Sequence, residues 1–403
     1  MRILLIAILS LLFTVACVAN QTIVAKDSEK LQEEIPDELL LQRLSNFPTT
    51  RPWPIEWFQP QERIMGGLLP NPTPTPRDNP HVDDVSWQKA VEYAKHTNSD
   101  VLFVWHDGKL DRAWSKEGYV TDSLTNTYYL NYFVLVLAYG IALEEGIFES
   151  IDISVDYFLP EWEGQERGRI TLRNLLQMHS GLELYKDNLD PTHKSTRLFF
   201  GSQTTEAALE FDLAQSPGTQ FEYNYVVPEI LGIILERASG ERYANFVSKR
   251  IWKPLGNSDA YVWLDGPDGR AHFNAALFAD ADDWLRIGVL IAQGGLWNGQ
   301  SIVPTAWIEE LSKPSPSNPA YGMVWLAEPY QQTRRLSNNV SYVIETQNPF
   351  TIEDLLIFDG YGGQRIYVSP EEQLVIVRIG ATARDNWDDS MIPNLIAGGL
   401  KQR

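Results

Sequence analysis

The chain has 403 residues, and its 33 Lys and Arg against 53 Asp and Glu give a formal net charge of −20. So acidic a protein repels polyanions, which excludes nucleic acid as a partner. The hydrophobic share of 44% with 21% charged residues is typical of a globular protein with a sizeable core. The single cysteine, Cys17, excludes an intramolecular disulfide, and the six histidines lack the helical spacing of a zinc site. We therefore expect no structural metal and no cofactor.

The first residues have the layout of a secretory signal, with Arg2 followed by an apolar run from Ile3 to Val15 that is too short to span a bilayer. Thr14-Val-Ala-Cys17 is similar to the lipobox of bacterial lipoproteins, although leucine is usual where Thr14 stands. This similarity implies a signal peptide over residues 1–16 and a lipid on Cys17; cleavage after Ala19 is the alternative. We expect an exported bacterial protein, anchored to a membrane by the lipid and facing the periplasm or the cell exterior.

Residues 17–80 are first acidic and then carry nine prolines between Pro48 and Pro80. This composition favours extended conformations and predicts a tether between the lipid anchor and a globular body. Four residues within it are too apolar for a pure spacer, so part of the segment is expected to dock on the body: Trp53, Ile55, Trp57 and Phe58.

The body is expected over residues 81–403. Helical spacing at 85–94 precedes two strands, 101–105 and 110–114, joined by a hairpin turn. Residues 130–143 are apolar on every side, which predicts a central helix buried all round. Helices are expected next at 171–178, 204–213, 228–238, 243–251, 281–291 and 305–311, and strands at 355–358, 364–368 and 374–379. Strands at both ends predict an α/β fold whose sheet is built from residues 81–118 and 315–403, with a helical insertion over 119–314.

Several stretches together resemble the serine β-lactamase and penicillin-binding-protein family, in its class C and 6-aminohexanoate-dimer-hydrolase-like branch. They fall in the family's order over about residues 85–400: Leu143–Ile147, Tyr157–Trp162, Ile170–Leu182, Pro217–Tyr223, Ile251–Gly256, Gly294–Gly299 and Gly360–Gln364. The resemblance implies a β-lactamase-like fold, with an antiparallel sheet flanked by helices.

The family's chemistry uses a Ser-x-x-Lys pair at the start of the central helix, where residues three apart share one face and the lysine can take the serine's proton. If Gly140 and Gly146 match the two glycines of that helix, the serine position falls on Tyr129 and the lysine position on Tyr132. A tyrosine hydroxyl, with a pKa near 10, needs a strong base to attack, and no lysine stands at the second position.

Two other serines are candidate nucleophiles. Ser123 lies six residues before Tyr129, about 240° round a helix and about 9 Å along it, and so cannot replace it. Ser86-Trp-Gln-Lys89 has the required spacing but lies in the first helix. The chain has no Gly-x-Ser-x-Gly elbow, which excludes an α/β-hydrolase.

Other parts of the family's site look retained. Tyr223 matches the second motif, where a tyrosine assists proton transfer, although Tyr225 stands where asparagine is common. Gly360 to Gly363 matches the third motif, and the resemblance gives the backbone N–H of Tyr361 the role of oxyanion donor. By the same resemblance, substrate-binding residues are expected at Tyr185, Gly360, Gly362, Gly363 and Gln364.

These observations favour a catalytically impaired or inactive homologue that binds a small-molecule or peptide-like ligand, or a partner, in the old cleft. The alternative is an active amidase or esterase with an unusual nucleophile or a substrate-activated water. A purely structural envelope lipoprotein is the third reading, disfavoured because Tyr223 and the glycine-rich edge persist together. The sequence identifies no protein partner.

Overall fold

The computed structural model describes residues 37–49, 51–67, 74–120, 123–335, 343–384 and 386–401. The expected signal peptide and Cys17 lie outside the described residues. The central element is a six-stranded antiparallel sheet in the order β3-β2-β14-β13-β12-β9. Its strands are β2 (Ser99–His106), β3 (Lys109–Ser115), β9 (Trp325–Leu326), β12 (Leu356–Gly360), β13 (Gln364–Ser369) and β14 (Leu374–Gly380). Because β14 pairs with β2, Ile376 opposite Val104, the two ends of the domain meet in mid-sheet, which confirms the predicted α/β architecture.

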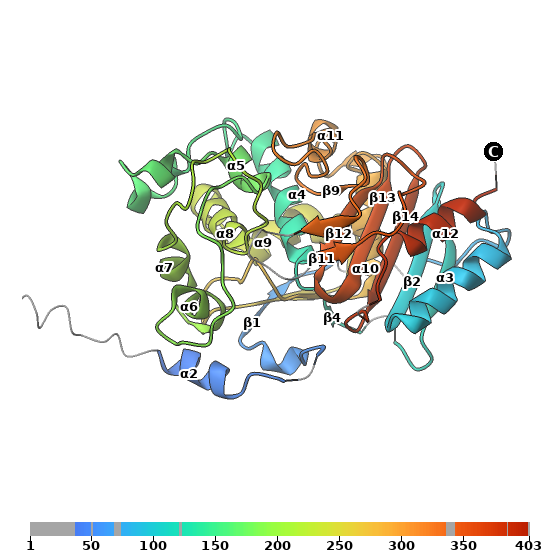
Figure 1. Cartoon of the computed structure of the whole chain (residues 1–403), viewed down its shortest axis with the longest axis horizontal. Coiled ribbons are helices and arrows are strands. Elements are labelled where there is room, and N and C mark those ends of the chain that lie inside the picture. Colours follow the sequence, from blue (N-terminus) through green and yellow to red (C-terminus); the bar gives the residue numbers. More distant parts are fainter. Residues whose placement is uncertain are drawn as a thin grey trace, which may run out of the picture.

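Helices cover both faces of this sheet (Figure 1). On one face α3 (Asp84–His96) packs against α12 (Met391–Gly399), and on the other lie α10 (Ala281–Ala292) and α4 (Leu130–Glu144). The sequence patterns predicted α3, α4 and α10. They did not predict α12, because it contains Pro393 and two glycines, which disfavour a helix. None of the helices in the described ranges is long and apolar enough to cross a membrane.

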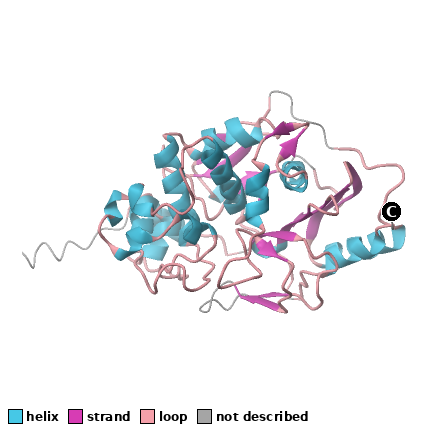
Figure 2. Ribbon diagram, turned by 90° about the horizontal axis from the view of Figure 1, so that it is seen from above, coloured by secondary structure: helices cyan, strands magenta, loops and turns pink. Residues whose placement is uncertain are grey.

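The helical part lies on the other side of α4, to the left in Figure 1, and the same division is visible from above in Figure 2. Its helices are α5 (Leu172–Leu176), α6 (Lys194–Phe200), α7 (Thr204–Leu209), α8 (Val226–Ser239) and α9 (Tyr243–Val247). Helix α11 (Thr305–Leu311) lies at the top of Figure 1. Short two-stranded ribbons are formed by β7 (Leu296–Trp297) with β8 (Gln300–Ser301) and by β10 (Thr333–Arg335) with β11 (Val343–Glu345).

Helix α4 is the core of the molecule, as its apolar pattern predicts: 13 of its 15 residues are buried. Gly140 is required there, since a Cβ at this position would lie 2.2 Å from the ring of Trp307. The Trp307 indole N–H donates to the carbonyl of Val136 at 3.0 Å, which locks α11 onto α4. The start of α4 is thereby held in one place relative to the sheet.

Residues 37–67, which we call the N-terminal arm, differ from the expected tether because they pack on the body. The arm contains α2 (Glu38–Ser45) and β1 (Gln61–Ile64), and β1 begins a second sheet in the order β1-β5-β6-β4, with β5 (Ala260–Trp263), β6 (Leu277–Ala279) and β4 (Thr125–Asn126). No pattern in the sequence predicted this second sheet. Figure 1 shows the arm in blue along the lower edge of the molecule.

Buried polar and aromatic contacts hold the arm in place. Arg43 is 4% exposed, and its guanidinium donates to the backbone carbonyls of Gln59, Phe200, Gly201, Leu264 and Asp265. Trp57 and Phe58 pack against Trp263, with ring centres 5.5 and 5.2 Å away. The docked part of the arm is therefore larger than expected and includes a helix and a paired strand. Pairing satisfies the backbone hydrogen bonds of the strand, and burial stabilises its aromatic side chains.

Candidate functional site

Tyr129 stands at the N-cap of α4 and presents its ring at the helix start. The turn before it is tight: Tyr128 has φ +52°, and its backbone N–H donates to the Asn126 side-chain oxygen at 2.9 Å. The Tyr129 ring is half-buried, with its centre 4.6 Å from that of Tyr225 and 5.9 Å from that of Tyr223. Burial, and then the neighbouring tyrosines, raises the pKa of Tyr129 well above 10. The hydroxyl at the expected serine position is therefore neutral at pH 7.

Tyr132 lies one turn further along α4 and is fully buried. Its hydroxyl donates to the carbonyl of Leu176 at 2.8 Å, so its proton is already engaged. Burial raises the pKa of Tyr132, which keeps the phenol neutral. A buried neutral hydroxyl cannot replace the lysine as a base.

Tyr223 and Tyr225 precede α8 and face the start of α4. Tyr223 is 4% exposed, and its ring stacks on Trp325 with centres 6.1 Å apart and planes at 19°. Its hydroxyl makes no hydrogen bond among the described residues. Burial and then the charge of Asp359 raise its pKa well above 10. Tyr223 thus offers an unpaired O–H donor at the position where the resemblance expects a proton-transfer tyrosine.

Tyr185 belongs to the same group of rings, since its centre lies 5.9 Å from that of Tyr225. Its backbone N–H donates to the side-chain oxygen of Asn224 at 3.3 Å, which joins the loop of Tyr185 to that of Tyr225. We call Tyr129, Tyr185, Tyr223 and Tyr225 the tyrosine cluster. Three of its rings are half-buried, so the cluster presents an aromatic face.

The glycine-rich edge connects β12 to β13 through a 3-10 turn, Tyr361–Gly363. This edge adjoins the start of α4, since a Cβ on Gly360 would lie 2.4 Å from the carbonyl oxygen of Thr127. Gly362 and Gly363 approach another segment: added Cβ atoms would lie 3.1 Å from Thr382 Cα and 2.8 Å from Ala383 Cβ. Both glycines have a positive φ, +77° at Gly362 and +86° at Gly363. Gly360 is the only expected substrate-binding glycine that the structure places against the helix start.

Two buried arginines fix the orientation of this edge. Arg365 donates to the carbonyl of Gly360 at 3.0 Å, and Arg378 donates to that of Gly362 at 3.2 Å. In a planar trans peptide the N–H points opposite to the carbonyl, so the N–H of Tyr361 points away from Arg365. This orientation suits the expected oxyanion donor.

Gln364 does not fit the substrate-binding role expected for it. It is 2% exposed, its side-chain N–H donates to the carbonyl of Gly380, and its side-chain oxygen accepts from the N–H of Gly380 at 3.0 Å. Both ends of the amide are therefore committed to the neighbouring strand. Gln364 closes the sheet behind the edge.

The rejected serines stand apart from the cluster. The Ser86 hydroxyl donates to Asp83 at 2.8 Å as part of the α3 cap, and Lys89 is exposed. Ser123 lies before β4, with its backbone N–H bonded to the carbonyl of Val120. Neither supplies a serine next to a lysine.

Within the described residues, the fold brings together one group of potential metal ligands that the spacing of histidines in the sequence did not indicate. One ligand atom each from His81, His106 and Asp111 lies within 4.8 Å of the others. Arg77 already occupies this place, with its Nε 3.1 Å from Asp111 Oδ1, and Asp111 also accepts from two backbone N–H groups, those of His81 and Val82. The group is satisfied as a charged network that ties the segment before α3 to the first hairpin.

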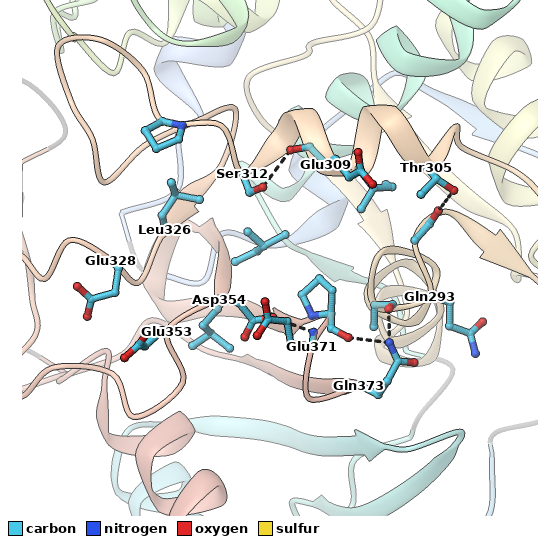
Figure 3. A pocket seen from close by; sticks show the side chains of 17 residues that line it. Gln293, Thr305, Glu309, Ser312, Leu326, Glu328, Glu353, Asp354, Glu371 and Gln373 are labelled. Carbon is cyan, nitrogen blue, oxygen red and sulfur yellow. Dashed lines mark hydrogen bonds between the residues drawn. The ribbon is translucent and has the colours of Figure 1, made fainter.

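A cavity of about 770 Å³ lies away from the tyrosine cluster, between α11, β9 and the β13–β14 turn (Figure 3). Five carboxylates line it: Glu309, Glu328, Glu353, Asp354 and Glu371. Asp354 is held by the Ser369 hydroxyl at 2.6 Å and the Glu371 N–H at 2.8 Å. None of the expected site residues lines this cavity.

Sequence reasoning missed several residues around the site. Tyr321 and Trp325 back the Tyr223 ring, and Asp359 lies near its hydroxyl. From the N-terminal arm, Trp53 packs its ring 5.9 Å from Tyr128, and Arg51 lies over Tyr361. The only available signal was the aromatic content of the arm, because contacts this far apart in the chain leave no spacing pattern.

Comparisons with known proteins identify the family of the chain. The Beta-lactamase family model matches residues 88–400. The 6-aminohexanoate-dimer hydrolase of Paenarthrobacter ureafaciens is 25% identical over 183 residues, 43% of this chain and 46% of that protein. Protein flp of Staphylococcus aureus (strain MW2) is 28% identical over 108 residues, 27% of this chain and 21% of that protein. The chain thus spans less than half the length of these curated relatives.

Solved structures show the same fold. A Bacillus anthracis protein described as a 6-aminohexanoate-dimer hydrolase superposes with a TM-score of 0.65 at 19% identity, covering 85% of this chain and 89% of that one. A family VIII carboxylesterase reaches 0.58 at 14% identity, over 79% and 98%. With the family model matching most of the sequence and the sheet built as expected, the chain belongs to the beta-lactamase family of serine hydrolases and penicillin-binding proteins.

Proposed function

We propose that this protein is a catalytically impaired member of its family that binds a ligand at the tyrosine cluster without forming an acyl-enzyme. The observation that carries the proposal is the start of α4, where the positions matched to the serine and lysine hold Tyr129 and Tyr132. Both phenols have a raised pKa, and the Tyr132 proton is bonded to a carbonyl. Among the described residues, no lysine is hydrogen-bonded to the hydroxyl of Tyr129 or Tyr132.

Features that suit binding remain beside this altered pair. The aromatic face offers ring surface, the Tyr223 hydroxyl offers an unpaired donor, and the Tyr361 N–H points away from Arg365. Aromatic surface with a few directed polar groups is typical of a small-molecule site. Relatives named as hydrolases and carboxylesterases favour an amide- or ester-like ligand.

Intact-protein mass spectrometry after incubation with penicillins, activated esters and fluorophosphonates tests the proposal. We expect no stoichiometric mass increase, because neither phenol can become a phenolate at neutral pH. An adduct that maps to Tyr129 or Ser123 would refute it and favour an active hydrolase. Loss of the nucleophile in another serine hydrolase costs about a million-fold in turnover, so any residual hydrolysis should be small.

We also propose export and lipid attachment at Cys17, on the lipobox-like Thr14–Cys17. Detergent phase partitioning of the wild type and Cys17→Ser, each expressed with its natural N-terminus, tests this. The wild type should enter the detergent phase and the variant the aqueous phase. A soluble wild type that begins at Asn20 would contradict it.

A further inference from the structure

Arg51 lies where the N-terminal arm reaches the glycine-rich edge. Its guanidinium carbon is 4.6 Å from the ring centre of Tyr361 and 5.1 Å from that of Trp53. The side chain is exposed and makes no hydrogen bond or ion pair with the residues that the structure describes. Arg51 is therefore a cation stacked on two aromatic rings, and its N–H groups have no acceptor among the described residues.

The rings that hold Arg51 are themselves fixed to the start of α4. The Trp53 N–H lies 3.4 Å from the hydroxyl of Tyr128, and the two rings are 5.9 Å apart. Tyr128 also packs against Tyr361 at 5.5 Å, and it directly precedes Tyr129. Arg51 is thus anchored between the edge that carries the Tyr361 N–H and the turn that carries Tyr129.

Stacking on aromatic rings occupies the faces of a guanidinium and leaves its planar fork of N–H groups free. That fork matches the two oxygens of a carboxylate and binds them in parallel. A net charge of −20 repels a dianion more strongly than a monoanion, which favours a carboxylate over a phosphate. The tyrosine cluster offers aromatic surface to the rest of such a ligand.

We propose that Arg51 is a ligand-recognition residue that binds the carboxylate of a monoanionic, partly apolar ligand between the glycine-rich edge and the turn that carries Tyr129. This inference rests on the proposed function, because it specifies the charge of the ligand that binds there. It assigns the N-terminal arm to the binding site, although the family match begins only at residue 88.

Calorimetric titration of the whole protein with phenylacetate and with uncharged phenylacetamide tests the proposal. The wild type should bind phenylacetate more tightly. Arg51→Gln should weaken phenylacetate binding by about tenfold or more and leave phenylacetamide unchanged, because a hydrogen bond to a charged group is lost. Arg51→Lys should retain part of the preference, since it keeps the charge without the fork. Arg63→Gln is the matched control, as Arg63 is an exposed arginine of the same arm, 3.5 Å from Asp259.

Three results would overturn the proposal: no binding of phenylacetate to the wild type, equal affinities in the wild type and Arg51→Gln, or tighter binding of phenylphosphonate than of phenylacetate. Failure of the proposed function has a different signature. It would be an acyl adduct in the mass spectrum of the wild type. That result is independent of the affinities of Arg51→Gln for phenylacetate and phenylacetamide.

Discussion

The start of α4 and the glycine-rich edge between β12 and β13 face each other, yet they differ in what they retain. The start of α4 has the rings of Tyr129 and Tyr132 at the positions where the resemblance expects a nucleophile and its base. The edge keeps its backbone geometry, held by Arg365 and Arg378. A single substitution can remove a reactive side chain and leave the fold intact. The orientation of a backbone segment that is held by buried hydrogen bonds changes only if those bonds change.

The largest expected effect concerns the edge. Arg365 and Asp389 are both buried, with an N–O distance of 2.7 Å. Arg365→Met should lower the free energy of unfolding by about 3–5 kcal/mol, because it leaves a buried carboxylate without its partner. Urea unfolding measures this, with exposed Arg384→Ala as the control. Adding Asp389→Asn should recover part of the loss; equal losses in the single and double variants would show that the pair does not hold the edge.

The next effect concerns α8, beneath the tyrosine cluster. Burial raises the pKa of Glu229 from 4.5 to about 8, although the N–H groups of Asn274 and Phe273 oppose it. Since the folded pKa is raised, the contribution of Glu229 to stability is fully present below pH 4.5 and is lost as the pH rises through 8. We expect the wild type to lose about 2–4 kcal/mol of unfolding free energy over this range.

Glu229→Gln should remove most of this loss, as the amide stays neutral while its oxygen can accept the same two N–H groups. Urea unfolding at pH 5, 7 and 9 tests it, with Glu206→Gln, exposed on α7, as the control. An unchanged pH dependence in Glu229→Gln would show that other groups cause it.

The smallest expected effect is a gain of activity. Tyr129→Ser with Tyr132→Lys would place a serine and a lysine where the resemblance expects the nucleophile and its base, next to the glycine-rich edge. We expect hydrolysis of an activated ester at least about tenfold above that of Tyr129→Ala with Tyr132→Lys, because general-base assistance contributes this much or more. The control lacks only the serine hydroxyl.

Each substitution removes aromatic bulk, and a cavity in so closely packed a core costs about 3–5 kcal/mol. Circular dichroism must therefore show that both double variants are folded. A folded Tyr129→Ser/Tyr132→Lys variant no more active than its control would mean that the edge has lost its catalytic geometry as well.

The sequence by itself determined the elements whose cause is local. An apolar pattern without a polar face made α4 a buried helix, and the paired strand patterns at both ends required a shared sheet. The ordered motifs predicted that the segments of Tyr129, Tyr223 and Tyr361 are neighbours, and the structure brings these segments together.

Only the tertiary structure decided what those residues can do. The Leu176 carbonyl that accepts the hydrogen bond of Tyr132 is 44 residues away, and the arginines that orient the edge bond to a carbonyl at the end of β12 and to one in the turn that follows it. Proline-rich composition predicted a tether, but pairing of β1 with β5 and burial of Arg43 made it an arm that brings Arg51 to Tyr361. Such contacts join residues that are far apart in the chain. A local sequence pattern therefore does not predict which distant group will accept from a buried donor or stack on a ring.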